Sequence, residues 1–188
     1  MTQAQMAVLS IVVIAIVAVA VLVVLRRRSA KLRARFGSEY DRAVAETGNR
    51  FKAEAKLENV EKRVKSYSLT ALSAADRDRF QQSWRKIQAD FVDDPARALA
   101  EADQLLGTVM MARGYPPSDF ENRAAEISVD HATVVENYRA GHDIAVRQSQ
   151  RQATTEDLRK GMIHYRALFD ELMAEEQVPL RARAVGRT

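Results

Sequence analysis

Hydrophobic positions form one continuous block near the start of the chain and a series of regularly spaced stripes after it. The block runs from Met6 to Leu25, and Ser10 is its only residue that is not hydrophobic. A helix of twenty residues is roughly 30 Å long, which matches the hydrocarbon core of a bilayer. Valine and isoleucine favour strands in water, but lipid requires the backbone to satisfy its own hydrogen bonds. The block therefore predicts a transmembrane helix at 6–25.

A cleaved signal peptide is the alternative explanation of this block. Signal peptides carry positive charge before the apolar region and a small-residue cleavage site after it. Residues 1–5 carry no charged side chain, and three consecutive arginines, 26–28, follow the block directly. We expect an uncleaved anchor, with a secreted protein as the alternative if the segment is removed.

Cations gather after the block, and none precedes it. Basic residues near a membrane end are retained on the cytoplasmic side, so we expect a single-pass membrane protein with residues 1–5 outside and the C-terminal domain in the cytoplasm. Each cation near an anionic membrane surface contributes about 1 kcal/mol of attraction. We therefore predict that residues 6–35 contact membrane lipid. The cations predicted to meet the headgroups are Arg26, Arg27, Arg28, Lys31, Arg33 and Arg35.

Beyond residue 35, hydrophobic residues recur in steps of three and four, which is the spacing of one face of a helix. The last stripe shows the pattern in Leu158, Met162, Tyr165, Phe169 and Leu172. No alternating run is long enough to indicate a sheet. The fold class expected is all-α, with a bundle of about five helices over 36–176.

Capping signals divide the stripes into separate helices, because a polar side chain at an N-cap accepts a hydrogen bond from the first turn. The predicted N-caps are Ser73, Asp94 before Pro95, Ser118 with Glu121, Asp130, and Thr154 or Thr155. Gly114 is expected to end the third long helix. At Gly48-Asn49 the chain either breaks or kinks, and we favour a break because glycine costs about 1 kcal/mol inside a helix.

Charge is distributed unevenly along the 188 residues, although the formal net charge is only +4. Six cations lie in the basic juxtamembrane segment, 26–35, and three lie in the tail, 177–188, which we expect to be disordered. All 25 acidic residues lie between these flanks together with the other 20 of the 29 cations, so the predicted bundle has a formal charge of −5. An acidic bundle argues against nucleic-acid binding, which needs a positive face.

Few residues offer catalytic or metal-binding chemistry. The chain has no cysteine, which excludes disulfides and thiolate chemistry. His131 and His142 are eleven residues apart, about 16 Å along one helix, which is too far for one metal ion. No nucleophile, phosphate-loop or metal motif occurs, and helix capping explains the adjacent Asp93 and Asp94. We expect no catalytic, cofactor or metal site.

Two places invite a recognition role. The loop Tyr115-Pro116-Pro117 could anchor a partner if the tyrosine is exposed, although such a tyrosine more often folds onto the bundle. An inter-helix pocket near Tyr138, Gly141, His142 and Tyr165 is the second place, and Gly141, on the same stripe as Tyr138, indicates the close approach of another helix.

Residues 32–44, LRARFGSEYDRAV, contain an RFGxEYDRAV-like motif directly after the predicted anchor. With FVDDP at 91–95, MARGYP at 111–116 and HYRALF at 164–169, this motif resembles a family of small uncharacterised bacterial single-pass membrane proteins. Ser38 stands where proline would be expected, and either residue suits a helix start. The resemblance implies a bacterial source and an anchored helical domain, and it implies no activity.

These observations favour a membrane-anchored, non-enzymatic helical protein that acts as an interaction or scaffold domain. Its bundle would bind an unknown protein partner or a second copy of itself. The alternative is a ligand-binding or enzymatic domain that uses the inter-helix pocket.

Overall fold

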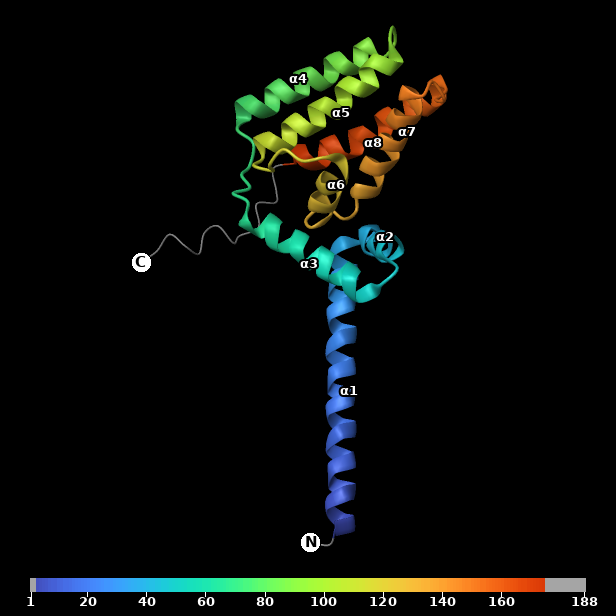
Figure 1. The fold of residues 1–188 in the computed structure, drawn as a ribbon. Coiled ribbons are helices and arrows are strands. Elements are labelled where there is room, and N and C mark those ends of the chain that lie inside the picture. Colours follow the sequence, from blue (N-terminus) through green and yellow to red (C-terminus); the bar gives the residue numbers. More distant parts are fainter. Residues whose placement is uncertain (1–2, 175–188) are drawn as a thin grey trace, which may run out of the picture. The chain divides into compact units, whose positions relative to one another are not determined.

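Figure 1 shows a computed structural model that describes the backbone of residues 3–174 and the side chains of residues 12–174. The described residues form helices and no strand, so the all-α fold class is confirmed for this part of the chain. The elements are α1 (Gln3–Phe36), α2 (Ser38–Thr47), α3 (Arg50–Ser66), α4 (Ala74–Asp90), α5 (Pro95–Ala112), α6 (Phe120–Ser128), α7 (Val135–Ser149) and α8 (Thr155–Met173).

The chain separates into two compact units, Met1–Glu58 (unit 1) and Asn59–Thr188 (unit 2). The division falls inside α3 and not at residue 36, where we expected the bundle to begin. Helices α4–α8 make up the five-helix bundle of unit 2, whereas α2 and the first half of α3 belong with α1. The reason is that polar side chains of α2 and early α3, such as Asp41 and Glu54, bond to side chains of α1.

Helix α1 is continuous across the predicted boundary between anchor and basic segment. No glycine or proline precedes Gly37, so nothing interrupts the helix. Its large apolar side chains between Val12 and Val24 are 42 to 67% exposed. Among the residues with described side chains, no helix is both long and apolar enough to cross a membrane.

The predicted stripes form the core of unit 2. Trp84 of α4 is 1% exposed and stacks on Phe169 of α8, with ring centroids 4.7 Å apart. Leu99 and Leu106 of α5 are equally buried and belong to the same core. Helices α5, α7 and α8 pack against one another, and α4 packs on α5. The spacing of apolar residues thus correctly indicated which face of each helix is buried.

Several predicted helix ends are confirmed. Ser73, Asp94 and Thr154 each accept a backbone hydrogen bond three residues on, and Thr154 forms a reciprocal capping box with Asp157. Gly114 follows α5 at φ 97°, where an added Cβ would lie 2.5 Å from a backbone oxygen. Only glycine fits this tight turn.

Two predicted starts are wrong. Asp119, not Ser118, caps α6 by accepting from the backbone of Asn122, and the Ser118 hydroxyl points to Glu126 at 3.5 Å. Asp130 does not open the next helix, because the chain continues through turns until Val135.

The delayed start of α7 has a tertiary cause. The ring of His131 is 4% exposed, and its Nδ1 lies 2.9 Å from the carboxylate of Glu171 on α8. This contact fixes the turn before α7, and sequence spacing gives no indication of it. The predicted end of α8 near residue 176 and the tail 177–188 lie outside the described residues.

Candidate functional site

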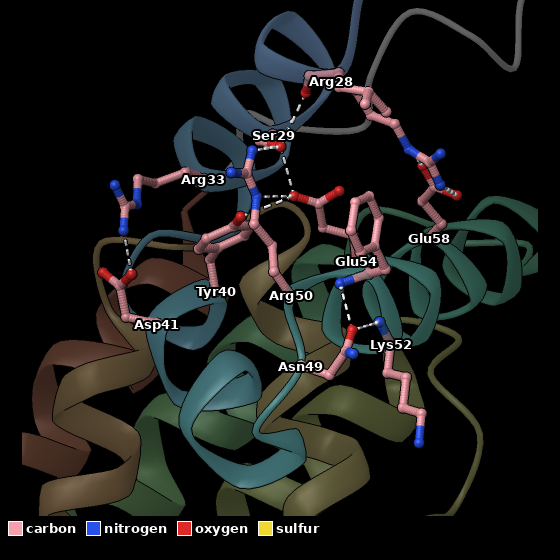
Figure 2. Close-up of polar contacts among 12 residues, drawn as sticks. Arg28, Ser29, Arg33, Tyr40, Asp41, Asn49, Arg50, Lys52, Glu54 and Glu58 are labelled. Carbon is pink, nitrogen blue, oxygen red and sulfur yellow. Dashed lines mark hydrogen bonds and ion pairs between the residues drawn. The ribbon is translucent and has the colours of Figure 1, made fainter. Parts of the chain in front are cut away.

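The strongest candidate site lies in unit 1, where α1, α2 and α3 fold back on one another (Figure 2). Gly37 at φ 55° ends α1, and Gly48 at φ 61° ends α2, both in a conformation that favours glycine. The Oδ1 atom of Asn49 then accepts hydrogen bonds from the backbone of Phe51 and Lys52 at 2.9 and 3.2 Å. The predicted break at Gly48-Asn49 is therefore confirmed. We call residues 26–58 the α1–α3 junction.

The carboxylate of Glu54 on α3 is the centre of the junction and is 2% exposed. Its Oε1 atom accepts hydrogen bonds from the Ser29 hydroxyl of α1 at 2.5 Å and from the Tyr40 hydroxyl of α2 at 2.9 Å. The Nε atom of Arg50, one turn earlier on α3, donates to the same oxygen at 2.9 Å. The Arg50 guanidinium also bonds to Ser29. Figure 2 shows these groups converging from the three helices.

These bonds keep the buried carboxylate charged. Burial by itself raises the pKa of Glu54, but the hydrogen bonds from Ser29, Arg50 and Tyr40 outweigh it, so its pKa lies below the ordinary value. A negative charge at Glu54 therefore holds the three helices together at neutral pH.

Two further ion pairs lie around this centre and are more exposed. Arg28 forms a two-pronged pair with Glu58, with both N···O distances at 2.5 Å. Arg33 pairs with Asp41, and its guanidinium lies 5.2 Å from the ring centroid of Tyr40. Both pairs join α1 to a later helix, so they orient the junction.

The six cations predicted to meet headgroups do not behave as one set. Arg28 and Arg33 are engaged by carboxylates, and Arg35 is only half-exposed. The other three are exposed and have no ion pair or hydrogen bond within the described part of the chain: Arg26, Arg27 and Lys31.

A pocket of about 370 Å³ opens in the junction. Its walls include Arg26, Ser29 and Arg33 of α1, Tyr40 and Asp41 of α2, and Arg50 of α3. Ser29, Tyr40, Arg50 and Glu54 are not among the site residues predicted from the sequence. The i, i+4 spacing of Arg50 and Glu54 was a usable signal, whereas Ser29 and Tyr40 join them only through the fold.

A second polar cluster lies inside unit 2, at the predicted inter-helix pocket. Tyr138 and Tyr165 are fully buried with ring centroids 6.3 Å apart. Burial, and next the charge of Asp103, raise the pKa of both hydroxyls well above the ordinary value. Within the described residues, three buried atoms near these rings lack a hydrogen-bond partner: Arg123 Nε, Tyr138 Oη and His142 Nδ1.

The surroundings of this cluster are tightly packed. A Cβ added at Gly141 would lie 2.6 Å from the ring of Tyr165, so the predicted close approach at Gly141 is confirmed. The ring of His142 stacks on Phe120 at 3.5 Å, and burial lowers the pKa of His142. At pH 7 this histidine is neutral.

Tyr115 of the predicted recognition loop and His164 of α8 both contact other side chains. Tyr115 is 3% exposed and contacts Tyr67 edge to face, while Pro116 and Pro117 are exposed. A partner-binding role of this loop therefore depends on the two prolines. His164 Nδ1 lies 2.9 Å from Asn137 Oδ1. Among the residues with described side chains, no group of three potential ligands could hold a metal ion.

Comparison with protein-family models, curated proteins and solved structures found no match to this chain.

Proposed function

We propose that this protein is a membrane-anchored, non-enzymatic interaction protein in which α1 holds the α1–α3 junction at the lipid surface. The observation that carries the proposal is the exposure of α1. Its apolar side chains from Val12 to Val24 point in all directions around the helix and remain 42 to 67% exposed. So large an apolar surface is stable only against lipid or another protein.

Length and charge support insertion in lipid. The described apolar side chains, 12–25, cover roughly 21 Å, and the apolar sequence from Met6 in the same helix extends this to roughly 30 Å. The exposed cations Arg26, Arg27 and Lys31 follow directly and suit anionic headgroups. Because these cations follow the apolar block and none precedes it, we expect the N-terminus outside and the residues after the block in the cytoplasm. The bacterial inner membrane is proposed from the family resemblance.

The interaction role is assigned to unit 2. A shallow groove of about 250 Å³ between α4 and α8 is lined by Phe91, Met162 and Ile163, and Arg159 and Arg166 flank it. Ile163 is 53% exposed. An apolar groove with charged edges is typical of a contact surface for a second protein or a second copy.

Membrane attachment is tested by extracting a membrane fraction with alkaline carbonate. The chain should stay in the membrane, and a variant with Val17→Arg and Val21→Arg should be released. Orientation is tested with a reporter fused after Thr188. Activity of a periplasmic reporter at this position would reject the proposed topology.

The interaction role is tested by affinity capture from detergent-solubilised membranes. We expect a stoichiometric partner or a homo-oligomer, and Ile163→Glu should reduce the capture. The matched control is Val146→Glu, an exposed apolar residue on α7 outside the groove. A monomer with nothing bound under several detergents would contradict this role.

A second candidate function is binding of a small polar ligand in the unit 2 cluster, and the three unpartnered atoms favour it. Tyr138→Phe tests for such a ligand. If no ligand bonds there, removing an unpaired hydroxyl leaves stability unchanged or raises it. If a ligand bonds there, this change lowers the Tm of the protein purified from cells, and denaturing mass spectrometry finds the released small molecule.

A further inference from the structure

The α1–α3 junction contains a pocket suited to one anionic group. Its walls carry three arginine side chains together with the buried residues Ser29 and Tyr40, whose hydroxyls donate to Glu54. Among the residues that the structure describes, no carboxylate contacts the guanidinium of Arg26. Its five N–H donors are therefore open to a ligand. We propose that this pocket binds the phosphodiester of an anionic lipid headgroup, a step that rests on the proposed membrane anchoring.

The spacing of the α1 residues supports the proposal. Arg26, Ser29 and Arg33 follow steps of three and four and therefore share one face of α1. Arg26 and Arg33 are separated by about 10 Å along the axis, so two guanidinium groups can reach an anion between them. Arg50 of α3 lies on the same pocket wall. Arginine is well suited to this task because its planar fork binds phosphate oxygens in pairs.

The charge of the pocket indicates which anion fits. Three arginines contribute positive charge, and Asp41 and Glu54, which pair with Arg33 and Arg50, offset two of them. The remaining single positive charge balances one negative charge. A phosphodiester with a neutral headgroup, such as that of phosphatidylglycerol, carries one negative charge, whereas a zwitterionic headgroup carries none in total.

The position of the pocket indicates the source of the phosphate. Arg26 follows Leu25, the last residue of the apolar block, without any intervening residue. If the block lies in the bilayer, the pocket begins at the depth of the headgroup phosphates. A lipid is therefore favoured over a free phosphate ester, because a site for a free ester would not need to lie at the depth of the headgroups.

The test measures lipid retention by the full chain. Native mass spectrometry in a neutral detergent counts phosphatidylglycerol and phosphatidylcholine molecules bound to each variant. We expect phosphatidylglycerol to be retained preferentially and Arg26→Gln to weaken its apparent affinity about tenfold, the loss of one charge-assisted contact. Arg27→Gln is the matched control, because Arg27 is adjacent, equally exposed and absent from the pocket wall. It should change the affinity less than threefold.

Arg26→Gln breaks no contact within the described residues, so loss of folding does not complicate the result. Equal effects of Arg26→Gln and Arg27→Gln would overturn the pocket and leave only diffuse attraction. Equal retention of both lipids would overturn it as well. A third measurement titrates glycerophosphoglycerol, the headgroup without acyl chains. If it binds as tightly as the lipid, the proposal that the phosphate comes from a lipid is contradicted.

The anchoring proposal is measured separately by carbonate extraction of the same variants. If the chain is extracted in every variant, the anchoring proposal fails whatever the lipid counts are. If the chain remains in the membrane and Arg26→Gln has no effect on lipid retention, only the pocket proposal fails.

Discussion

Unit 1 and unit 2 are both helical and both bury apolar side chains, but only unit 1 is described with a charged network at its centre. Unit 2 has a continuous apolar core in which Trp84 stacks on Phe169. In unit 1, a buried carboxylate, Glu54, joins three helices through hydrogen bonds. Hydrophobic burial is nondirectional and tolerates salt and pH, whereas a charged network depends on protonation and geometry. Unit 1 should therefore respond to conditions that leave unit 2 unchanged.

The largest expected effect is in the core of unit 2. Phe169→Ala removes a buried aromatic ring and should lower the free energy of unfolding by about 3 to 5 kcal/mol. Trp84 is the only tryptophan of the chain and contacts this ring, so its fluorescence in urea reports unit 2 alone. A loss below about 1 kcal/mol would show that this core is loosely packed.

The next effect comes from overpacking in the same unit. Gly141→Ala places a Cβ 2.6 Å from the Tyr165 ring and should cost about 1 to 3 kcal/mol, again measured by Trp84 fluorescence. Gly107→Ala is the control, because its Cβ would meet only a terminal nitrogen of the Arg123 side chain, which can shift more easily than a ring. This control should be neutral or stabilising by about 1 kcal/mol. Similar costs at the two glycines would contradict the packing of α7 on α8.

A smaller effect is expected at the centre of unit 1. Glu54→Gln replaces the charged acceptor of the hydrogen bonds from Ser29, Tyr40 and Arg50 with a neutral amide. This change should destabilise the junction by about 1 to 2 kcal/mol. Hydrogen–deuterium exchange of residues 38–58 should increase, while the urea midpoint of Trp84 should not move. The control, Glu46→Gln, loses only an exposed pair with Lys56 and should show neither change.

The same carboxylate gives unit 1 a defined pH dependence. The folded-state pKa of Glu54 is lower than the unfolded value of about 4.3, so the folded state binds fewer protons than the unfolded state. The stabilisation is complete above the unfolded-state pKa and is lost as the pH falls through the folded-state pKa. Exchange corrected for its intrinsic rate should therefore rise at low pH in residues 38–58, and Glu54→Gln should abolish this component. An unchanged pH response in the variant would reject the role of Glu54.

The smallest effect is expected at exposed ion pairs. Arg159→Ala removes a pair with Glu156 in which both side chains are 54% exposed. Exposed pairs of this kind contribute little to stability, so thermal unfolding should be almost unchanged. A clear fall in Tm would show that surface charge matters as much in unit 2 as in unit 1.

The sequence predicted unit 2 better than the candidate site. Burial of Phe80, Trp84 and Ile87 followed from helical spacing, because a helix in water must place its apolar stripe inward. The N-caps Ser73, Asp94 and Thr154 were also predictable, since capping is a contact over three residues. The error at Ser118 is a shift by one residue to the neighbouring cap, Asp119. The error at Asp130 arose where the contact of His131 with Glu171 competes with the local signal.

The candidate site was predicted only in part. The cations Arg26 and Arg33 were identified from composition, but their different roles were not. Arg33 is paired because α2 brings Asp41 to it, and Arg26 is free of carboxylates in the described structure. Pairing across helices depends on the turns at Gly37 and Gly48, whose directions the residue pattern does not specify.

The sequence by itself determined the helical class, the buried faces, most helix ends and an apolar block followed by cations, because each depends on residues within one or two helical turns. Only the tertiary structure decided that α2 and early α3 belong with α1 and that Ser29, Tyr40 and Arg50 surround Glu54. These contacts join residues up to 25 positions apart. They form because a buried carboxylate must find donors wherever the fold supplies them, and no local pattern records which residues those are.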